Sequence, residues 1–297
     1  MELNIKRKLY KLNLWAYLFI LPALIFYSVF TLRPLVQSIV LSFYDWDGFN
    51  PIKNFIGFTN YKEAFSDPVL GLALFNNIKW VIISLILSQG TALLLAVLIS
   101  RCIIGQSFFR SVLFFPNMLS PMITALIWGR IYDPLIGLIN TLLKIMGYGY
   151  LAKGWLGSPE WALIAVCIAN SWRAYGYYMV LYLAGLQSVD PTLYDAAKVD
   201  GASGWQEFWY VTLPSIRPTT TLVLSLALIN SLMAFDMVWG MTQGGPFRRS
   251  EVLSTLIYKT AFASDRVGYG CALSLMQAIL IFTITILFIR IRERSEG

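Results

Sequence analysis

The sequence contains no histidine, and charged residues occupy only 13% of its 297 positions. Histidine is the commonest general base and a frequent metal ligand, so its absence argues against many hydrolytic and metal-dependent sites. No segment has the form G-x-x-x-x-G-K-[ST], the phosphate-binding loop of many ATPases. We therefore expect no catalytic site, no metal and no cofactor in this chain, and any chemical energy that it uses has to come from elsewhere.

Cysteine is also scarce. The three cysteines, Cys102, Cys167 and Cys271, lie in or beside apolar runs without the close spacing of metal ligands. We interpret them as small apolar packing residues.

The net charge of +7 comes from 23 Lys and Arg against 16 Asp and Glu. In so apolar a chain this excess indicates anchoring at a membrane face, and not nucleic-acid binding.

Apolar residues dominate what is present. They make up 57% of the chain, and the mean hydropathy of +0.64 is too high for a soluble domain with a charged surface. A helix needs about 20 mostly apolar residues to cross a bilayer. Six runs meet this length and predict an all-α membrane protein with spans at residues 14–32, 75–99, 112–131, 161–184, 219–239 and 270–289.

The basic residues predict the orientation. An even number of spans places both termini on one side, and each terminus carries a basic cluster: Lys6, Arg7, Lys8 and Lys11 before the first run, and Arg290, Arg292 and Arg294 after the last. The positive-inside rule assigns that side to the cytoplasm. Eight basic residues on the predicted outer side weaken this prediction, whereas Arg101, Arg110, Lys198 and Arg217 in the short inner segments support it. The first run has no small-residue cleavage site after it, so we expect it to remain as an anchor.

A polar loop, residues 185–218, separates the fourth run from the fifth and falls on the cytoplasmic side. Asp190 and Pro191 are typical of a helix start, Gly201 of a helix end in the left-handed region, and Ser203 of a second start. The second helix is expected to run to Pro214. The loop is therefore predicted to be a helix-turn-helix.

This loop resembles the EAA loop of the membrane subunits of binding-protein-dependent ABC importers, in which a short helix docks into a groove on the ATPase subunit. Asp195 stands where the family usually has glutamate. The alternative is an interfacial loop that merely connects two spans. The matching positions are Asp195, Ala196, Ala197, Gly201, Val211, Leu213 and Pro214.

The resemblance covers nearly the whole chain. Within the family, the sequence is similar to the carbohydrate-uptake branch and in particular to its maltose-type subunits. It implies a single permease domain over 1–297 with the type I importer fold, located in the bacterial inner membrane. It also implies four kinds of partner: a second related permease, two ATP-binding subunits that hold ATP and Mg, an extracytoplasmic solute-binding protein, and a sugar or oligosaccharide. No internal repeat indicates that one chain forms both halves. The matching segments are Phe55 to Tyr61, Phe65 to Pro68, Asp133 to Pro134, Gly137 to Asn140, Gly244 to Pro246 and Gly268 to Tyr269.

Polar and small residues in the fourth and fifth runs predict a solute pathway. Polar side chains inside a span are costly and usually face a cavity or a partner. In the family that the sequence resembles, these two spans line the sugar site. Amide groups bind sugar hydroxyls, and aromatic rings bind the faces of pyranose rings. The alternative is helix–helix packing, which small residues and amides also favour. The candidates are Asn170, Arg173, Ala174 and Tyr177, which share one helical face, and Ala227, Asn230, Ser231, Ala234 and Asp236.

Arg173 is the most unusual of these residues, because an arginine inside a span stays charged and needs a partner. Asp236 would make it a structural tie, whereas an anionic solute would make it a ligand. We favour an acidic carbohydrate, with a neutral oligosaccharide as the alternative.

Pro116 and Pro121 predict a kink in the third run, with a gate hinge as a second possibility. A secondary transporter would explain only the polar spans, and a membrane-embedded enzyme would need a catalytic constellation that we do not find.

Overall fold

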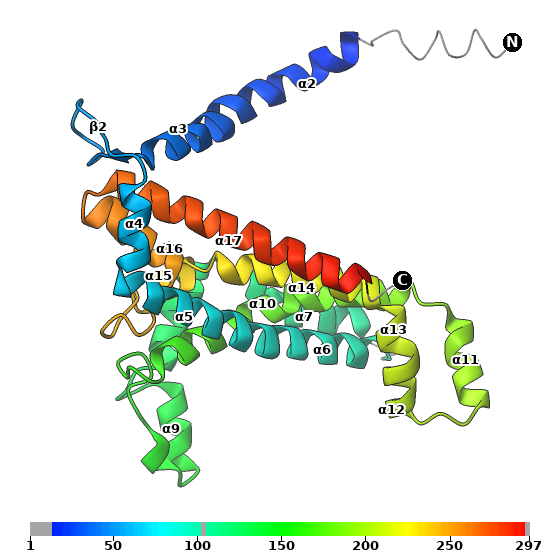
Figure 1. Ribbon diagram of the computed structural model, residues 1–297. Coiled ribbons are helices and arrows are strands. Elements are labelled where there is room, and N and C mark those ends of the chain that lie inside the picture. The colour runs from blue at the N-terminus through cyan, green and yellow to red at the C-terminus, as the bar shows by residue number, and fades with distance from the viewer. Residues whose placement is uncertain (1–13, 102–104, 295–297) are drawn as a thin grey trace, which may run out of the picture. The chain divides into compact units, whose positions relative to one another are not determined.

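The computed structural model describes residues 14–101 and 105–294, and these are mostly helical (Figure 1). They form two units. The first consists of the described residues up to Glu63 together with Thr260–Leu275, and the second of Ala64–Lys259 together with the residues from Met276 onward. The basic residues Lys6, Arg7, Lys8 and Lys11, on which the orientation partly depends, lie outside the described residues, as does Cys102.

The first unit begins with one long helical run, composed of α2 (Leu14–Tyr27), a π-helical turn (Ser28–Leu32) and α3 (Arg33–Leu41). No residue from Tyr17 to Leu41 is buried within the structure, although the run is strongly apolar. Apolar surface of this kind is stable only against lipid or another protein. The run is thus nine residues longer than the predicted first span, which ended at Leu32.

A small hairpin and the start of two further helices complete this unit. Strand β1 (Tyr44–Asp45) pairs antiparallel with β2 (Asn54–Phe55), and α4 (Thr59–Ser66) and α17 (Val267–Arg294) begin in the same unit. The buried amide of Asn60 donates hydrogen bonds to the carbonyls of Ser42 and Tyr44, at 2.9 and 3.0 Å. Because Ser42 is buried and Tyr44 is half-buried, the amide satisfies carbonyl groups that have limited access to water.

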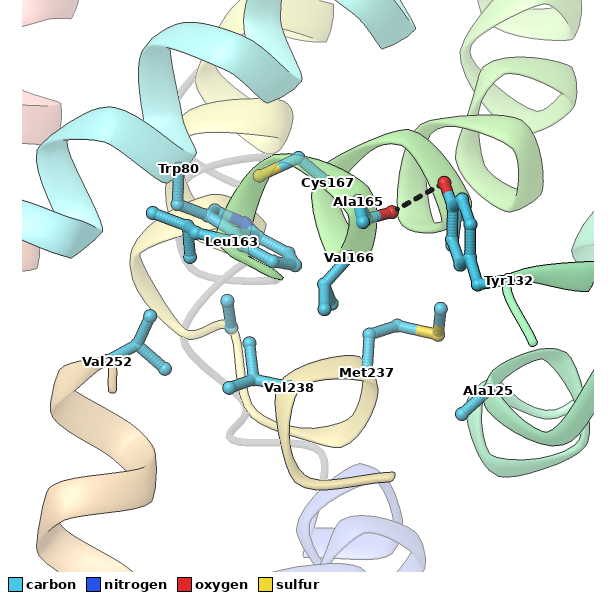
Figure 2. Packing of buried hydrophobic residues seen from close by; sticks show 12 residues of the cluster. Trp80, Ala125, Tyr132, Leu163, Ala165, Val166, Cys167, Met237, Val238 and Val252 are labelled. Carbon is cyan, nitrogen blue, oxygen red and sulfur yellow. Dashed lines mark hydrogen bonds between the residues drawn. The ribbon is translucent and has the colours of Figure 1, made fainter. Parts of the chain in front are cut away.

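The second unit is built around α10 (Ala162–Gln187), which packs against α5 (Pro68–Ser84), α6 (Gly90–Ser100) and α7 (Gln106–Met118), and against α14 (Arg217–Leu232). A π-helical turn, Leu85–Gln89, joins α5 and α6 into one helix, and Figure 1 shows this helix running beside α10 and α14. Figure 2 shows the core where α10 meets its neighbours, including Trp80 and Cys167. Cys167 is fully buried and free, as its predicted packing role requires, and Cys271 is a free, half-buried cysteine in α17.

The third run is bent, as Pro116 and Pro121 predicted. It consists of α7 and α8 (Pro121–Ile131), which meet at an angle of 94°. Pro121 cannot donate a backbone hydrogen bond, and Ser120 caps the new helix by accepting from the Ile123 amide at 3.2 Å. The predicted kink is therefore confirmed, and it is sharper than a proline kink within one continuous helix. Beyond it lie α9 (Leu138–Ile145) and a 3₁₀ turn (Gly149–Leu151).

The fifth run is also interrupted, contrary to the prediction of one helix over 219–239. Helix α14 ends at Leu232, and α15 (Asp236–Met241) begins after a break of three residues; α16 (Leu253–Tyr258), a π-helical turn (Lys259–Ala263) and α17 follow. The break is built into the fold, because the Leu232 carbonyl accepts hydrogen bonds from Asn77 and Gln277, at 3.4 and 2.9 Å. Side chains from two other helices thus replace the missing helical bonds.

Three continuous helices in the described part are long and apolar enough to cross a membrane: Tyr17–Leu41, Pro68–Ser100 and Val267–Arg292. Two bent helix pairs raise the number to five if each pair counts as one span. At 26 residues, α10 is long enough to cross but carries more polar residues. The membrane-embedded helical fold is clear, and the count of six spans stays a prediction.

Candidate functional site: a polar cavity and a helical loop

A cavity of about 290 Å³ lies in the second unit, between α5, α10, the α7–α8 bend and the break after α14. Of the nine predicted pathway residues, eight line it. The ninth, Ala227, is only 3% exposed and belongs to the hydrophobic core. The lining residues from the prediction are Asn170, Arg173, Ala174, Tyr177, Asn230, Ser231, Ala234 and Asp236. Their contact with a solute stays a prediction.

Helix α10 brings four of these residues to the cavity because their spacing of three, one and three places them on one face. Gly176 is buried and lies to one side of this face. A Cβ atom at Gly176 would overlap the backbone carbonyl of Leu113, so its absence lets α10 and α7 approach closely. This close packing holds α10 rigidly, and the polar face is thereby fixed toward the cavity.

Helix α14 is tied to α10 across the cavity. The amide Nδ2 of Asn230 donates a hydrogen bond to the Tyr178 hydroxyl at 3.3 Å. Asn230 therefore both lines the cavity and links two helices, so the solute-binding and packing interpretations of this residue are compatible. The break after α14 adds Phe235, which stacks on Trp239 with a ring distance of 5.7 Å, and Asp236 at the start of α15. Broken helices within a membrane protein are tolerated where they line such a cavity.

Two opposite charges share the cavity wall. Arg173 and Asp236 interact electrostatically, but Arg173 forms no salt bridge with any residue that the structure describes. Its buried Nε also makes no hydrogen bond within the described chain. The sequence analysis offered Asp236 and an anionic solute as partners for Arg173. Asp236 thus lies at the same cavity without being bound to Arg173. The guanidinium retains donor capacity that a solute could use.

Sequence reasoning missed the contribution of α5 and of the bends. Ser84 and Ser88 lie four residues apart in an apolar run, a spacing that places both on one helical face and could have identified them. Asn117 and Phe235 depend on the bend and on the break, which hydropathy alone does not reveal. The missed lining residues are Trp80, Ser84, Ser88, Asn117, Pro121, Tyr178, Met233, Phe235 and Met237.

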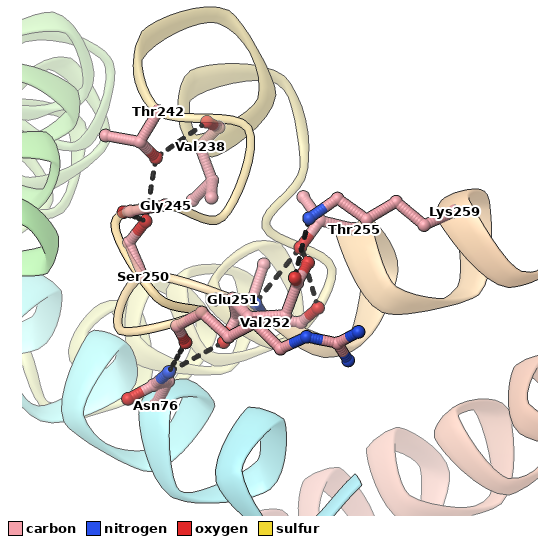
Figure 3. Close-up of polar contacts among 10 residues, drawn as sticks. Asn76, Val238, Thr242, Gly245, Ser250, Glu251, Val252, Thr255 and Lys259 are labelled. Atoms are coloured by element: carbon pink, nitrogen blue, oxygen red, sulfur yellow. Dashed lines mark hydrogen bonds and ion pairs between the residues drawn. The ribbon is translucent and has the colours of Figure 1, made fainter. Parts of the chain in front are cut away.

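A buried polar network supports the segment between α15 and α16 (Figure 3). Glu251 is fully buried, and its carboxylate accepts from Lys259 Nζ and from the Thr255 hydroxyl, both at 2.6 Å. Asn76 of α5 donates to the Glu251 carbonyl at 2.9 Å. A buried charge that is paired and hydrogen-bonded in this way fixes the segment to the helices around the cavity. Sequence reasoning did not single out Glu251.

The loop over 185–218 forms the predicted helix-turn-helix. Helix α11 (Pro191–Val199) starts at Asp190, whose carboxylate accepts from the Thr192 amide, and this hydrogen bond lowers the pKa of Asp190. Gly201 has φ of +75°, as predicted for the turn. Ser203 then caps α12 (Gly204–Glu207) in a capping box with Gln206. A π-helical turn (Phe208–Thr212) and α13 (Leu213–Ser215) carry the second helix one residue past Pro214.

The predicted coupling residues lie at the surface of this loop. Asp195, Ala196, Gly201 and Pro214 are exposed, and Ala197, Val211 and Leu213 are half-buried. The Asp195 carboxylate contacts Lys198 within the same helix at 3.3 Å, and both side chains remain mostly exposed. Such a pair contributes little to stability. The carboxylate thus remains accessible to another protein. Within residues 14–101 and 105–294, no cluster of His, Cys, Asp or Glu could hold a metal ion.

Known proteins resemble this chain in sequence and in fold. Residues 90–296 match the family described as "Binding-protein-dependent transport system inner membrane component". The chain is 35% identical to "Probable ABC transporter permease protein YurN" of Bacillus subtilis, over 95% of this chain and 96% of that protein. It is 30% identical to the trehalose/maltose transport system permease protein MalF of Thermococcus litoralis, with 98% of each chain covered. Among solved structures, a chain of a bacterial ABC transporter involved in the import of the acidic polysaccharide alginate superimposes with a TM-score of 0.82, at 25% identity, over 98% of this chain and 97% of that chain.

Proposed function

Because the chain belongs to the family of binding-protein-dependent transport system inner membrane components, we propose that it forms half of the solute pathway of an ATP-driven sugar importer. The family match confirms the resemblance seen in the sequence. It also establishes a membrane-embedded transport subunit of the type I importer fold, and not an enzyme. The secondary transporter and the membrane-embedded enzyme are therefore set aside.

The polar cavity is the observation that carries this proposal. A volume of about 290 Å³ is large enough for a sugar unit and is lined by amides, hydroxyls, aromatic rings and two charged groups. Polar groups inside a membrane protein are costly, and where they occur they usually face a cavity and mark a solute pathway. Their convergence from four helical segments is difficult to explain by packing alone.

Sugars are the solute class that fits this lining best. The relative from Thermococcus litoralis is named as a trehalose/maltose permease. Tyr177 and Phe235 offer aromatic faces for pyranose rings, and Asn170, Asn230 and Ser231 offer hydrogen-bonding groups for hydroxyls. The cavity is thus suited to a carbohydrate whose hydroxyls replace water.

Within this class, Arg173 favours an acidic carbohydrate. Its guanidinium lines the cavity without a salt bridge among the described residues, and a planar guanidinium binds carboxylate in a bidentate manner. The structural relative imports an acidic polysaccharide. Asp236 on the same wall opposes this preference, because it would repel an anion. A neutral oligosaccharide is therefore the alternative.

The helix-turn-helix is proposed to couple this pathway to ATP hydrolysis on partner chains. Its small residues Ala196 and Ala197 permit close approach, and Asp195 supplies an exposed charge. We propose an assembly with a second related permease, two ATP-binding subunits that hold ATP and Mg, and an extracytoplasmic solute-binding protein. The chain is a multi-pass membrane protein, and we propose that both termini and this loop face the cytoplasm.

Purification of the complex tests the proposed function. The chain should co-purify with a related permease and an ATP-binding protein, and solute-loaded binding protein should stimulate ATP hydrolysis by the reconstituted complex. Binding protein without solute is the matched control. If the purified chain has no ATP-binding partner, or if loaded binding protein leaves the hydrolysis rate unchanged, the proposal is wrong.

A further inference from the structure

An ion pair joins the helical loop to the end of the helix α5–α6. Arg101 follows the last residue of α6, and its Nη2 donates to Oε1 of Glu207 in α12 at 2.7 Å. The two residues are 106 positions apart in the sequence. The Glu207 side chain is only 15% exposed and that of Arg101 is 50% exposed. The contact is therefore a specific link between two distant segments.

The surroundings hold both side chains in position. A Cβ atom at Gly204 would lie 3.5 Å from Nη1 of Arg101, an ordinary van der Waals distance, so the guanidinium lies against the start of α12. The capping box of Ser203 and Gln206 fixes this start, and the Glu207 carbonyl accepts from the Thr212 hydroxyl at 3.3 Å. Glu207 thus ends a short, capped helix whose hydrogen bonds connect it to the rest of the loop.

The other end of the same helix reaches the polar cavity. The segment Pro68–Ser100 is helical throughout, and it carries Trp80, Ser84 and Ser88 on the cavity wall. If the Arg101 end of this helix is displaced, the displacement is transmitted along the helix, because a hydrogen-bonded helix resists stretching and compression. The π-helical turn, Leu85–Gln89, contains Ser88, which is nearest in sequence to Arg101 among the cavity residues of this helix.

We propose that the Arg101–Glu207 ion pair is a latch through which the loop moves the helix Pro68–Ser100 and thereby changes the cavity. Arg101 and Glu207 are positioning residues in this account, and the proposal rests on the transport function proposed above. Partly exposed ion pairs contribute little to folding stability, so the latch can be broken without unfolding the protein. Its loss should therefore affect coupling more than assembly.

A charge swap tests the latch. The complex is reconstituted in proteoliposomes with Arg101→Glu, with Glu207→Arg, and with both changes together, and solute uptake is measured together with ATP hydrolysis. Each single variant should lower the amount of solute transported per ATP by roughly fivefold or more, in the usual range of coupling between two sites. The double variant restores an opposite-charge pair and should return to within about twofold of the unmodified complex.

A control uses the other Arg–Glu pair among the described residues, Arg266 with Glu63, which is bidentate at 2.7 Å and has both side chains half-exposed. Its single and double swaps should leave transport per ATP unchanged. If either single variant of the latch fails to assemble, Arg101→Gln and Glu207→Gln replace the two reversals and should show the same loss. Normal coupling in the assembled single variants overturns the latch, and so does a double variant as impaired as they are. An unmodified complex without ATP-dependent uptake would instead contradict the proposed function.

Discussion

At the scale of single residues, Arg173 is the most informative side chain of the cavity. A permanent charge inside a membrane protein is retained when a function requires it, since its desolvation costs several kcal/mol. The structure brings Asp236 to the same cavity without forming a salt bridge with Arg173. A structural tie would need a closer contact, and the solute interpretation is therefore the stronger one.

Replacing Arg173 with glutamine should selectively reduce the uptake of acidic carbohydrate. The amide keeps hydrogen bonds to hydroxyls but loses the attraction for a carboxylate, so we expect a loss of about tenfold or more, the effect of a charged hydrogen bond of about 1.5–3 kcal/mol. Competition between an acidic and a neutral oligosaccharide in reconstituted complexes measures the selectivity. Arg173→Lys is the control that keeps the charge. Equal uptake by the glutamine variant, or failure of that variant to assemble, would assign Arg173 a structural role.

Gly201 allows a second prediction at this scale. Nothing in this chain lies within 4 Å of a Cβ atom placed at Gly201, so the backbone φ of +75° is the main constraint that the chain itself places on this position. Gly201→Val should strain the turn by on the order of 1 kcal/mol or more and uncouple ATP hydrolysis from transport. Gly201→Asn tolerates the left-handed region and should retain most of the coupling. Transport per ATP is the measurement, and normal coupling in the valine variant would contradict the role of this turn.

At the scale of helices, sequence patterns predicted the loop well and the broken helices poorly. The start at Asp190, the turn at Gly201 and the cap at Ser203 are all local signals, and the structure confirms each one. The break after Leu232 is different, because it depends on hydrogen bonds from Asn77 and Gln277, which are far away in the sequence. Hydropathy does not record such contacts, and the fifth run therefore looked continuous.

The same distinction explains the outcome at the cavity. Helical spacing correctly grouped the four residues of α10, because they share a face of one uninterrupted helix. Ala227 was placed on the pathway by the same rule but lies in the core. Helical spacing shows which residues share a face of a helix. The packing of the neighbouring helices decides which part of that face meets the cavity.

The packing of α10 against α7 yields a prediction for helix elements. Gly176→Ala places a methyl group against the Leu113 carbonyl and should destabilise the protein by about 1–3 kcal/mol, as overpacking does. Gly71→Ala in α5 meets nothing within 4 Å and should be neutral or stabilising, by up to about 1 kcal/mol. Thermal unfolding of the detergent-solubilised proteins compares the two. Equal stability of both variants would show that the contact between α10 and α7 is looser than described.

At the scale of the whole molecule, the orientation in the membrane is open to a direct test. The six-span arrangement predicts that the loop containing Gly204 faces the cytoplasm and that the segment containing Gly245 faces outward. Single cysteines are introduced near these positions into a variant whose three natural cysteines are replaced by serine or alanine. A membrane-impermeant thiol reagent added to intact cells should label only the cysteine near Gly245. Labelling at both positions from one side would exclude this arrangement.

Energy coupling is the central claim, and uptake into proteoliposomes tests it most directly. Complexes containing this chain are reconstituted with the solute-binding protein, and labelled carbohydrate is followed either with ATP enclosed or with a proton gradient and no ATP. The account predicts accumulation with ATP and none with the gradient alone. Accumulation driven by the gradient in the absence of ATP would contradict it.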